Sequence, residues 1–192
     1  MVEPFQDLVR EHHLIGRVLS VLERSAQRIL TDQVVPVDTL SDAIGFLEQF
    51  AASSHHPKEE GALFPLLASK PGISAHGALL TLATDHIFGR SRIQNLRKVF
   101  PLTGSSSADR STFGGLLSAC ALETRHHLSR EAQIVFPLAR ASLNGSELTW
   151  LASAFAKIEQ HSETNVSEYS MAAVARIEAL FEAETLLRSH SR

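Results

Sequence analysis

The chain has 192 residues, 44% hydrophobic and 20% charged, which suits one domain with a sizeable core. A formal charge of −3 spread over interspersed acids and bases disfavours nucleic-acid and anionic-membrane partners, and no apolar run approaches the roughly 18 residues that span a bilayer. The single cysteine, Cys120, excludes an internal disulfide framework and a cysteine-rich zinc site, and without a signal-peptide core in MVEPFQDLVREHH we expect a cytoplasmic protein.

Helical periodicity dominates the chain. Apolar residues recur at steps of three and four in four segments, which cover residues 5–22, 40–66, 79–100 and 113–138. Helices that carry such stripes pack at shallow angles around a shared core. We therefore predict an all-α fold, with an antiparallel up-down four-helix bundle in residues 1–145.

Residues 146–192 predict an additional C-terminal helix that packs on the bundle or in a subunit contact. The segments ELTWLASAFAKIEQ and VSEYSMAAVARIEALFEAETLLR carry its pattern, with a break expected near residues 161–166. We expect Trp150 and Phe155 to fasten this helix to the bundle. A homodimer remains an open alternative.

Each of the four stripes contains a histidine where packing alone would place an apolar side chain. Two stripes add a glutamate one turn later, and residues four apart share a face of a helix. Counted from the helix ends of an up-down bundle, all these side chains lie within roughly two or three turns of one level. They are His12, His55, Glu59, His86, His127 and Glu131.

A lone histidine in such a stripe is ordinarily a hydrogen-bonded core residue, and a lone glutamate ordinarily marks a misjudged face. Two buried carboxylates that meet four imidazoles are different, because unpaired buried carboxylates are costly. A pair of divalent metal ions would remove that cost. The nitrogen and oxygen donors exceed what a closed tetrahedral zinc site uses, and they favour non-haem iron over manganese.

An internal repeat indicates the register of these residues. Segments 55–66 (HHPKEEGALFPL) and 126–138 (HHLSREAQIVFPL) are nearly the same phrase. Phe-Pro follows Glu131 at the fifth and sixth positions, and it follows Glu59, not Glu60, by the same count. The repeat favours the pair His55/Glu59 over His56/Glu60, and His127 over His126 as the partner of Glu131.

The four segments resemble, in order, the motifs of the hemerythrin-like (HHE cation-binding) family. The matching stretches are EHHLIGRVLSVLE, HHPKEEGALFPLL, TDHIFGRSRI and HHLSREAQIVFPLA, and the resemblance covers about residues 5–140. It implies a four-helix bundle that holds two iron ions in an oxo- or hydroxo-bridged di-iron centre. Carried onto this chain, the implied ligands are His12, His55, His86 and His127, with Glu59 and Glu131 as bridges.

The chain departs from the oxygen-carrying hemerythrins in two places. Those carriers have a second histidine one turn after the first in the third motif, where this chain has Arg90. Their fourth-helix acid is an aspartate one residue beyond the position of Glu131. One iron is then open or takes another ligand, for which the candidates are His13, His56, Glu60, His126, His161 and Tyr169. Reversible oxygen storage is therefore not favoured.

Several neighbouring residues are expected to support the site. A metal-bound imidazole needs an acceptor at its other ring nitrogen, and Asp85, Glu60 and Glu123 are candidates for that role. Arg90 either pairs with a buried carboxylate or stays solvated. Cys120 is expected to be a buried, inert thiol.

Three functions remain open at this point. A di-iron protein could bind O2, NO or peroxide for sensing or detoxification. An enzyme could consume peroxide or NO at an open coordination position. The alternative is an iron- or metal-buffering protein without small-molecule redox chemistry.

Overall fold

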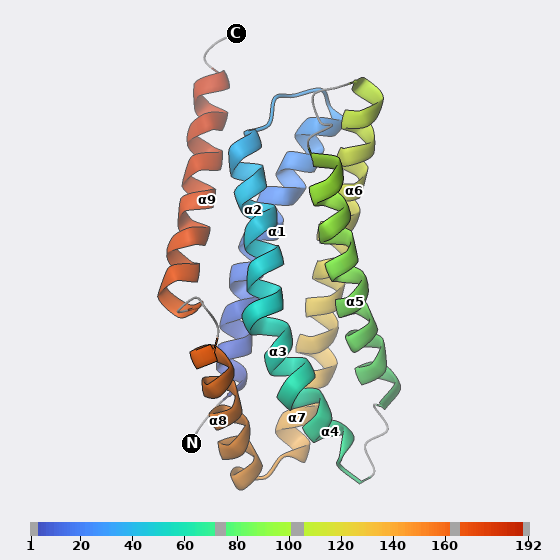
Figure 1. Ribbon diagram of the computed structural model, residues 1–192, viewed down its shortest axis with the longest axis vertical. Coiled ribbons are helices and arrows are strands. Elements are labelled where there is room, and N and C mark those ends of the chain that lie inside the picture. The colour runs from blue at the N-terminus through green and yellow to red at the C-terminus, as the bar shows by residue number, and fades with distance from the viewer. Residues whose placement is uncertain (1–3, 72–75, 101–105, 162–165, 190–192) are drawn as a thin grey trace.

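The computed structural model describes residues 4–71, 76–100, 106–161 and 166–189, and within these ranges the chain is helical with no β-strand. The predicted all-α class is confirmed. Six helical rods follow one another in this part of the chain (Figure 1), two of them interrupted by wider π-helical turns. The rods are α1 (Phe5–Leu30); α2 (Val37–Phe50) with α3 (His56–Lys58) and α4 (Phe64–Ala68); α5 (His76–Val99); α6 (Ser107–Arg130) with α7 (Phe136–Ser142); α8 (Gly145–His161); and α9 (Val166–Ser189).

The helices α1, α2, α5 and α6 lie side by side along the long axis of the molecule (Figure 1). α1 packs against α2 and α6, and α5 packs against the same two helices, so the four enclose a common interior. α9 lies along α1 and α2, whereas α8 lies towards the other end and contacts α3. The expected break in the C-terminal segment is present, because α8 ends at His161 and α9 begins at Val166.

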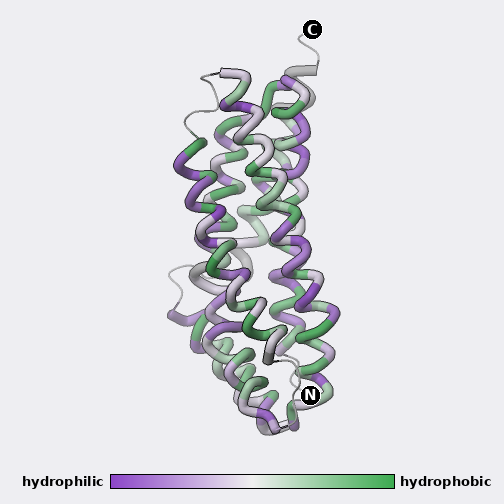
Figure 2. Tube along the Cα trace, turned by 90° about the vertical axis from the view of Figure 1, so that its right-hand side faces the viewer, coloured by the Kyte–Doolittle hydropathy of each residue, from purple (hydrophilic) through white to green (hydrophobic). Residues whose placement is uncertain are grey.

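Local sequence explains where these helices begin and which face they bury. α1 begins directly after Pro4, whose fixed φ and missing N–H suit the start of a helix. Leu8 and Ile15 belong to its single buried face. At the start of α6, the side chain of Ser106 accepts a hydrogen bond of 3.1 Å from the backbone N–H of Asp109. Figure 2 shows hydrophobic and hydrophilic residues alternating along the rods.

Two π-helical turns, η2 (Glu59–Leu63) and η4 (Glu131–Val135), occupy equivalent places in the repeat. In each, the carbonyl of the glutamate accepts a hydrogen bond from the N–H five residues later, on Phe64 and Phe136. The sequence leaves open whether Pro65 and Pro137 kink their helices or end them. The helices instead continue through a wider turn, which ends just before a proline that cannot donate to the carbonyl four residues back.

In the fourth helical segment, residues 113–138, the buried face differs by one residue from the expected stripe. That stripe includes Leu116 and Ile134, but they are 40% and 45% exposed. Leu117 and Val135 are buried in their place. For Val135 the reason is the extra residue in the turn that starts at Glu131, which a regular helical count does not include.

Buried apolar side chains form two clusters, one towards each end of the rods. On α1 the change from one cluster to the other falls between Leu8 and Leu14, and on α5 it falls between Leu82 and Leu96. In both helices, the stretch between the two clusters contains the histidine that the sequence places in the apolar stripe. The core is therefore two apolar layers with one polar layer between them.

The two C-terminal helices each complete one of these clusters. Phe155 on α8 joins the cluster that contains Leu8, and Phe181 on α9 joins the other. The prediction for Phe155 agrees with this packing, whereas the prediction for Trp150 is wrong, because its side chain is 52% exposed. The buried face of α8 carries Leu151 and Phe155 instead.

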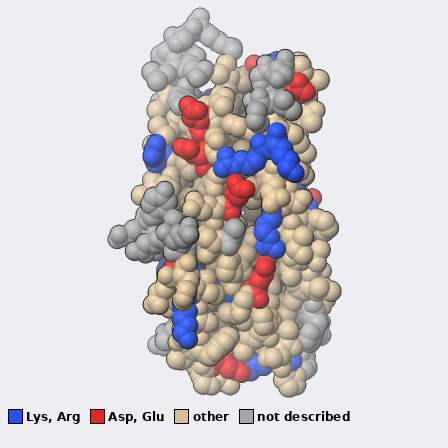
Figure 3. All heavy atoms as spheres, in the orientation of Figure 1, with Lys and Arg blue, Asp and Glu red and all other residues tan. Residues whose placement is uncertain are grey.

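On the face shown in Figure 3, basic and acidic side chains alternate and no large patch of one sign forms. This agrees with the near-balanced charge of the sequence. Among the residues that the structure describes, no helix is long and apolar enough to cross a membrane.

Candidate metal centre

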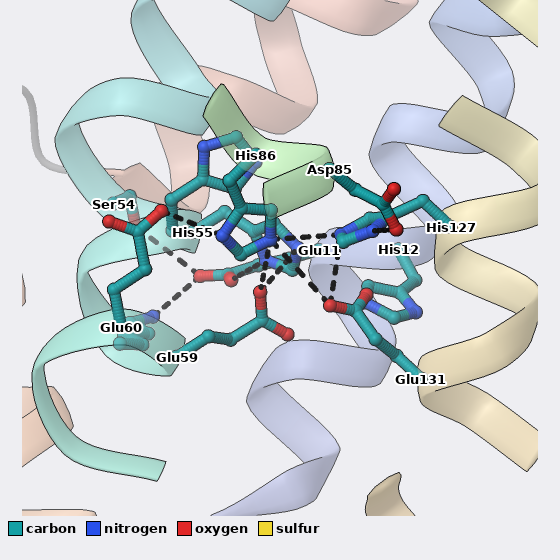
Figure 4. Close-up of polar contacts among 12 residues, drawn as sticks. Glu11, His12, Ser54, His55, Glu59, Glu60, Asp85, His86, His127 and Glu131 are labelled. Carbon is teal, nitrogen blue, oxygen red and sulfur yellow. Dashed lines mark hydrogen bonds and ion pairs between the residues drawn. The ribbon is translucent and has the colours of Figure 1, made fainter. Parts of the chain in front are cut away.

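Six ligand-type side chains converge in the polar layer between the apolar clusters (Figure 4). They form two groups that share Glu59 and Glu131, and within each group the donor atoms lie within 4.8 Å of one another. One group adds His12 and His55, and the other adds His86 and His127. The six residues that the sequence singles out are therefore brought together as two adjoining positions with both carboxylates in common.

The shortest contacts run between the glutamates and the imidazoles. Nε2 of His127 lies 2.9 Å from Glu131, and Nε2 of His12 lies 3.3 Å from the same carboxylate. Nε2 of His86 lies 3.3 Å from Glu59, and a further 2.9 Å separates it from Nε2 of His127. Each carboxylate thus faces imidazoles that come from different helices.

Several polar atoms in this layer have no hydrogen-bond partner among the described residues. They are both oxygens of Glu59, both oxygens of Glu131, and Nε2 of His12 and His55. The two glutamates are fully buried. Buried carboxylates are strongly unfavourable unless positive charge compensates them, so this layer requires a cationic component. Histidine nitrogens and bridging carboxylates suit first-row divalent metals, and the donors present fit a pair of such ions.

When no metal is bound, protonated imidazoles supply part of the positive charge that the two buried carboxylates require. Burial disfavours a charged imidazole at His55, but the charges of Glu59 and Glu11 outweigh burial and raise the pKa of His55 to about 9. Burial also opposes protonation of His86, yet the nearby Glu131 and Glu59 raise its pKa to about 10. Burial would raise the pKa of Glu131, but the surrounding imidazoles hold it well below its ordinary value.

Behind His55 lies a buried ion pair that orients the ring. Nδ1 of His55 lies 2.9 Å from Oε2 of Glu11, and Lys58 donates to the other oxygen of that carboxylate over 2.5 Å. The hydroxyl of Ser54 contributes a third contact of 3.3 Å. Lys58 is completely buried and also pairs with Glu159 of α8. The ring of His55 is therefore fixed with Nε2 directed at the shared carboxylates.

A similar carboxylate–cation pair orients the ring of His86. Nδ1 of His86 lies 2.7 Å from Glu60, and Arg90 donates to that carboxylate over 2.8 Å. Arg90 also lies 3.4 Å from Nδ1 of His56, whose ring stacks on His86 at a centroid distance of 3.8 Å. Arg90 thus pairs with Glu60 at the edge of the site, although this carboxylate is partly exposed and not buried as one alternative from the sequence proposes.

A third pair supports His127. Nδ1 of His127 lies 3.4 Å from Asp85, which accepts a hydrogen bond of 2.5 Å from Arg130. Of the three orienting carboxylates expected from the sequence, Asp85 and Glu60 take that position. Glu123 instead pairs with Arg92, 3.4 Å away.

His12 differs from the other three imidazoles. Within the described part of the chain, no carboxylate binds its Nδ1; its ring packs on Phe136 at a centroid distance of 5.1 Å. It is also the least enclosed of the six, with a side chain that is 9% exposed. This ring is therefore the least constrained of the four.

The remaining candidates for an extra ligand are placed differently from one another. His56 and Glu60 lie beside His86 and form a third group with it. His13, His126 and His161 are exposed, and Nδ1 of His161 contacts the carbonyl of Lys157 in its own helix. The side chain of Tyr169 lies outside the described residues.

Two residues of the site escaped the sequence analysis, Glu11 and Lys58. The positions of both residues in the sequence could have indicated a role beside the ligands. Glu11 directly precedes His12, and Lys58 lies three residues after His55, on the same face of the helix. Cys120 agrees with expectation, because it is buried and burial raises the pKa of its thiol.

A small cavity adjoins the position that His86 and His127 define. Its volume is about 50 Å³, and it extends between α5 and α6. The apolar side chains of Ile15, Leu47, Ile93 and Leu128 form part of its lining, and His55, His56, His86 and His127 form another part. The cavity has room for a molecule of a few atoms.

The fold and the site together define a helical protein with a buried centre of histidines and carboxylates that is built to hold cations. The family model of the hemerythrin HHE cation binding domain matches residues 3–139, and the chain belongs to this family. Uncharacterized proteins of Mycobacterium bovis and Mycobacterium tuberculosis are 26% identical to it over 159 residues, which is 81% of this chain. The chain spans about 60% of the length of these curated relatives.

Proposed function

We propose that this protein binds two iron ions and uses them to interact with O2, NO or peroxide, in sensing or detoxification. Residues 1–145 are then an antiparallel four-helix bundle of the hemerythrin kind, and residues 146–192 are a helical extension packed on it. The observation that carries the proposal is the pair of fully buried carboxylates, Glu59 and Glu131, whose four oxygens all lack hydrogen-bond partners among the described residues.

In this proposal each ion has two imidazoles of its own. His12 and His55 hold one ion, His86 and His127 hold the other, and Glu59 and Glu131 bridge the two. The two anionic bridges offset half of the charge of two divalent cations, which a site of neutral imidazoles alone does not. The carboxylate–cation pairs behind three of the imidazoles bind Nδ1 of each ring and so hold its Nε2 towards the centre.

The chain itself selects what can reach the second ion. Bound iron supplies redox chemistry towards small oxygen and nitrogen species. The cavity beside His86 and His127 admits only molecules of a few atoms, and its apolar lining favours neutral ones. Arg90 lies where the oxygen carriers have a further histidine, and it binds Glu60, so it contributes no ligand atom to the centre.

Metal content and absorption spectra test the ion assignment. We expect about two irons per chain after purification in air, as the two adjoining ligand positions require, with charge-transfer absorption in the near-ultraviolet and visible range. His127→Ala should lose iron and lower the melting temperature, because it leaves Glu131 uncompensated. The exposed neighbour provides the matched control, since His126→Ala should keep its metal. Equal iron in the two variants would refute the ligand assignment.

Titration of the iron-loaded protein with O2, NO and peroxide tests the small-molecule part. A spectral change at stoichiometric NO or peroxide that is lost in Glu59→Ala supports the proposal. If none of the three alters the spectrum while several irons per chain load and leave readily under chelation, metal buffering is the better description.

A further inference from the structure

We propose that a divalent cation reaches the centre through the groove between α1 and α6, with His13 and His126 as its first ligands and His12 as the side chain that passes it inwards. This inference rests on the proposed metal binding and adds to it an external entry point that a cation occupies only in passing. The argument uses residues that take no part in the six-ligand set, apart from His12.

The groove is open to solvent and reaches the metal layer. Its volume is about 860 Å³, and it runs between two helices that are in close contact along their length. His13 on α1 and His126 on α6 are exposed and line the groove from opposite sides. His12 lines it as well, and Nε2 of His12 is buried without a hydrogen-bond partner. One imidazole thus adjoins both the groove and the shared carboxylates.

His12 is the one imidazole of the four that no carboxylate–cation pair holds from behind within the described residues. The rings of His55, His86 and His127 are each tied to a carboxylate that a lysine or arginine holds in turn. No such carboxylate contacts His12 within the described ranges, and its ring rests against Phe136. In that part of the chain its polar contact is on the inner side alone, where Nε2 lies 3.3 Å from Glu131, so His12 is the ligand that can turn outwards and back.

The charges around the groove do not oppose a cation. Arg17 and Arg125 line it, but Arg17 binds Glu178 over 2.6 Å and Arg125 binds Glu23 over 2.9 Å. With both guanidinium groups neutralised, the uncompensated charge nearest the floor is that of the buried glutamates. A hydrated ion is therefore drawn towards the centre while imidazoles replace its water molecules one by one.

The cavity between α5 and α6 is a poorer route for an ion. Its wall contains several aliphatic side chains, and it holds only about 50 Å³. A space of this size does not hold a cation together with its bound water, whereas the groove between α1 and α6 does. The two openings therefore differ in what they admit, with ions on the α1–α6 side and small neutral molecules on the α5–α6 side.

Loading kinetics of metal-free protein with Co²⁺ alone test the route, together with removal of the bound ion by EDTA. The double variant His13→Ala/His126→Ala should load about tenfold more slowly, while the final stoichiometry stays that of the unmodified chain. His161→Ala, which removes an exposed histidine on α8, should load at the unmodified rate. An unchanged rate in the double variant would overturn the inference, and so would a lower final stoichiometry, because the two histidines would then be ligands of the centre.

Blocking variants give a second readout that does not depend on the histidines. Ala132 is exposed and lines the groove, so Ala132→Trp should slow both loading and removal. Gly89 lines the other opening, and a Cβ there would meet no atom within 4 Å, so Gly89→Leu narrows that opening and should leave both rates unchanged. Slower loading in Gly89→Leu alone would place the route on the α5–α6 side. Failure of the unmodified protein to bind Co²⁺ or iron at equilibrium would instead refute the proposed function itself.

Discussion

Lys58 provides the sharpest test of how the site is held together. Its side chain is completely buried, and its ammonium group binds Glu11 and Glu159 and lies 5.8 Å from the ring centroid of Phe155. Replacing it by Met keeps most of the apolar volume and removes the charge. Glu11, itself only 6% exposed, then keeps His55 and a serine hydroxyl as partners.

The expected cost follows from that burial. Breaking a buried ion pair by removing one partner costs about 3–5 kcal/mol. For a chain of this size each kcal/mol lowers the melting temperature by about 2–4 °C, so Lys58→Met should melt on the order of 10 °C lower. Since Glu11 orients His55, the affinity for metal should also fall by about 10–100-fold.

Thermal unfolding followed by circular dichroism, with and without metal, measures both effects. Lys70→Met is the matched control, because Lys70 pairs with Glu147 on the surface and should shift the melting temperature much less. Adding Glu11→Gln to Lys58→Met should recover part of the loss, since the uncompensated charge is then gone. Equal shifts in the two lysine variants would refute the view that Lys58 anchors the site.

Three further outcomes are expected. The pKa values of His55 and His86, about 9 and about 10, exceed the ordinary 6.5, so their stabilisation of the metal-free protein is complete below pH 6.5 and is lost as the pH rises through 9 to 10. Denaturant titrations should therefore show the unfolding free energy falling over that range without metal, and a matching fall in the metal-loaded protein would contradict this reasoning. Metal binding near pH 7.5 should release about two protons into weakly buffered solution, one from each of these imidazoles, measurable with a pH indicator. Gly115→Ala should raise the melting temperature, because its Cβ meets no atom within 4 Å, whereas Gly114→Ala should raise it less or lower it, because its Cβ would lie 3.0 Å from Ile29.

The repeat in the sequence agrees with the structure on which side chains lie together in the polar layer. The count from Glu131 to Phe-Pro selects Glu59 over Glu60, and the structure places Glu59 in the shared position while Glu60 binds the far side of His86. The same count selects His127 over the exposed His126. It succeeds because both glutamates begin the same π-helical turn before the same dipeptide, so their geometry repeats with their sequence.

The errors have equally local causes. Ile134 was placed in the core by a regular helical count that cannot include the extra residue of a π-helical turn. The periodicity of residues 146–192 does not tell which of Trp150 and Phe155 faces the bundle, and the buried face of α8 carries Phe155. Glu11 and Lys58 were missed because each looks like a surface residue until the chain partners that bury it are known.

The sequence by itself determined the helices, the level at which the buried histidines and glutamates lie, and which of two adjacent residues belongs to that level. These follow from periodicity and from residue type, which are local. The tertiary structure alone decided which carboxylate and which cation lie behind each imidazole. Glu11 meets His55, Glu60 meets His86 and Asp85 meets His127 across helix interfaces, at separations of 44, 26 and 42 residues. Such pairings depend on how the rods turn about their axes when they pack, and no count along one helix contains that rotation.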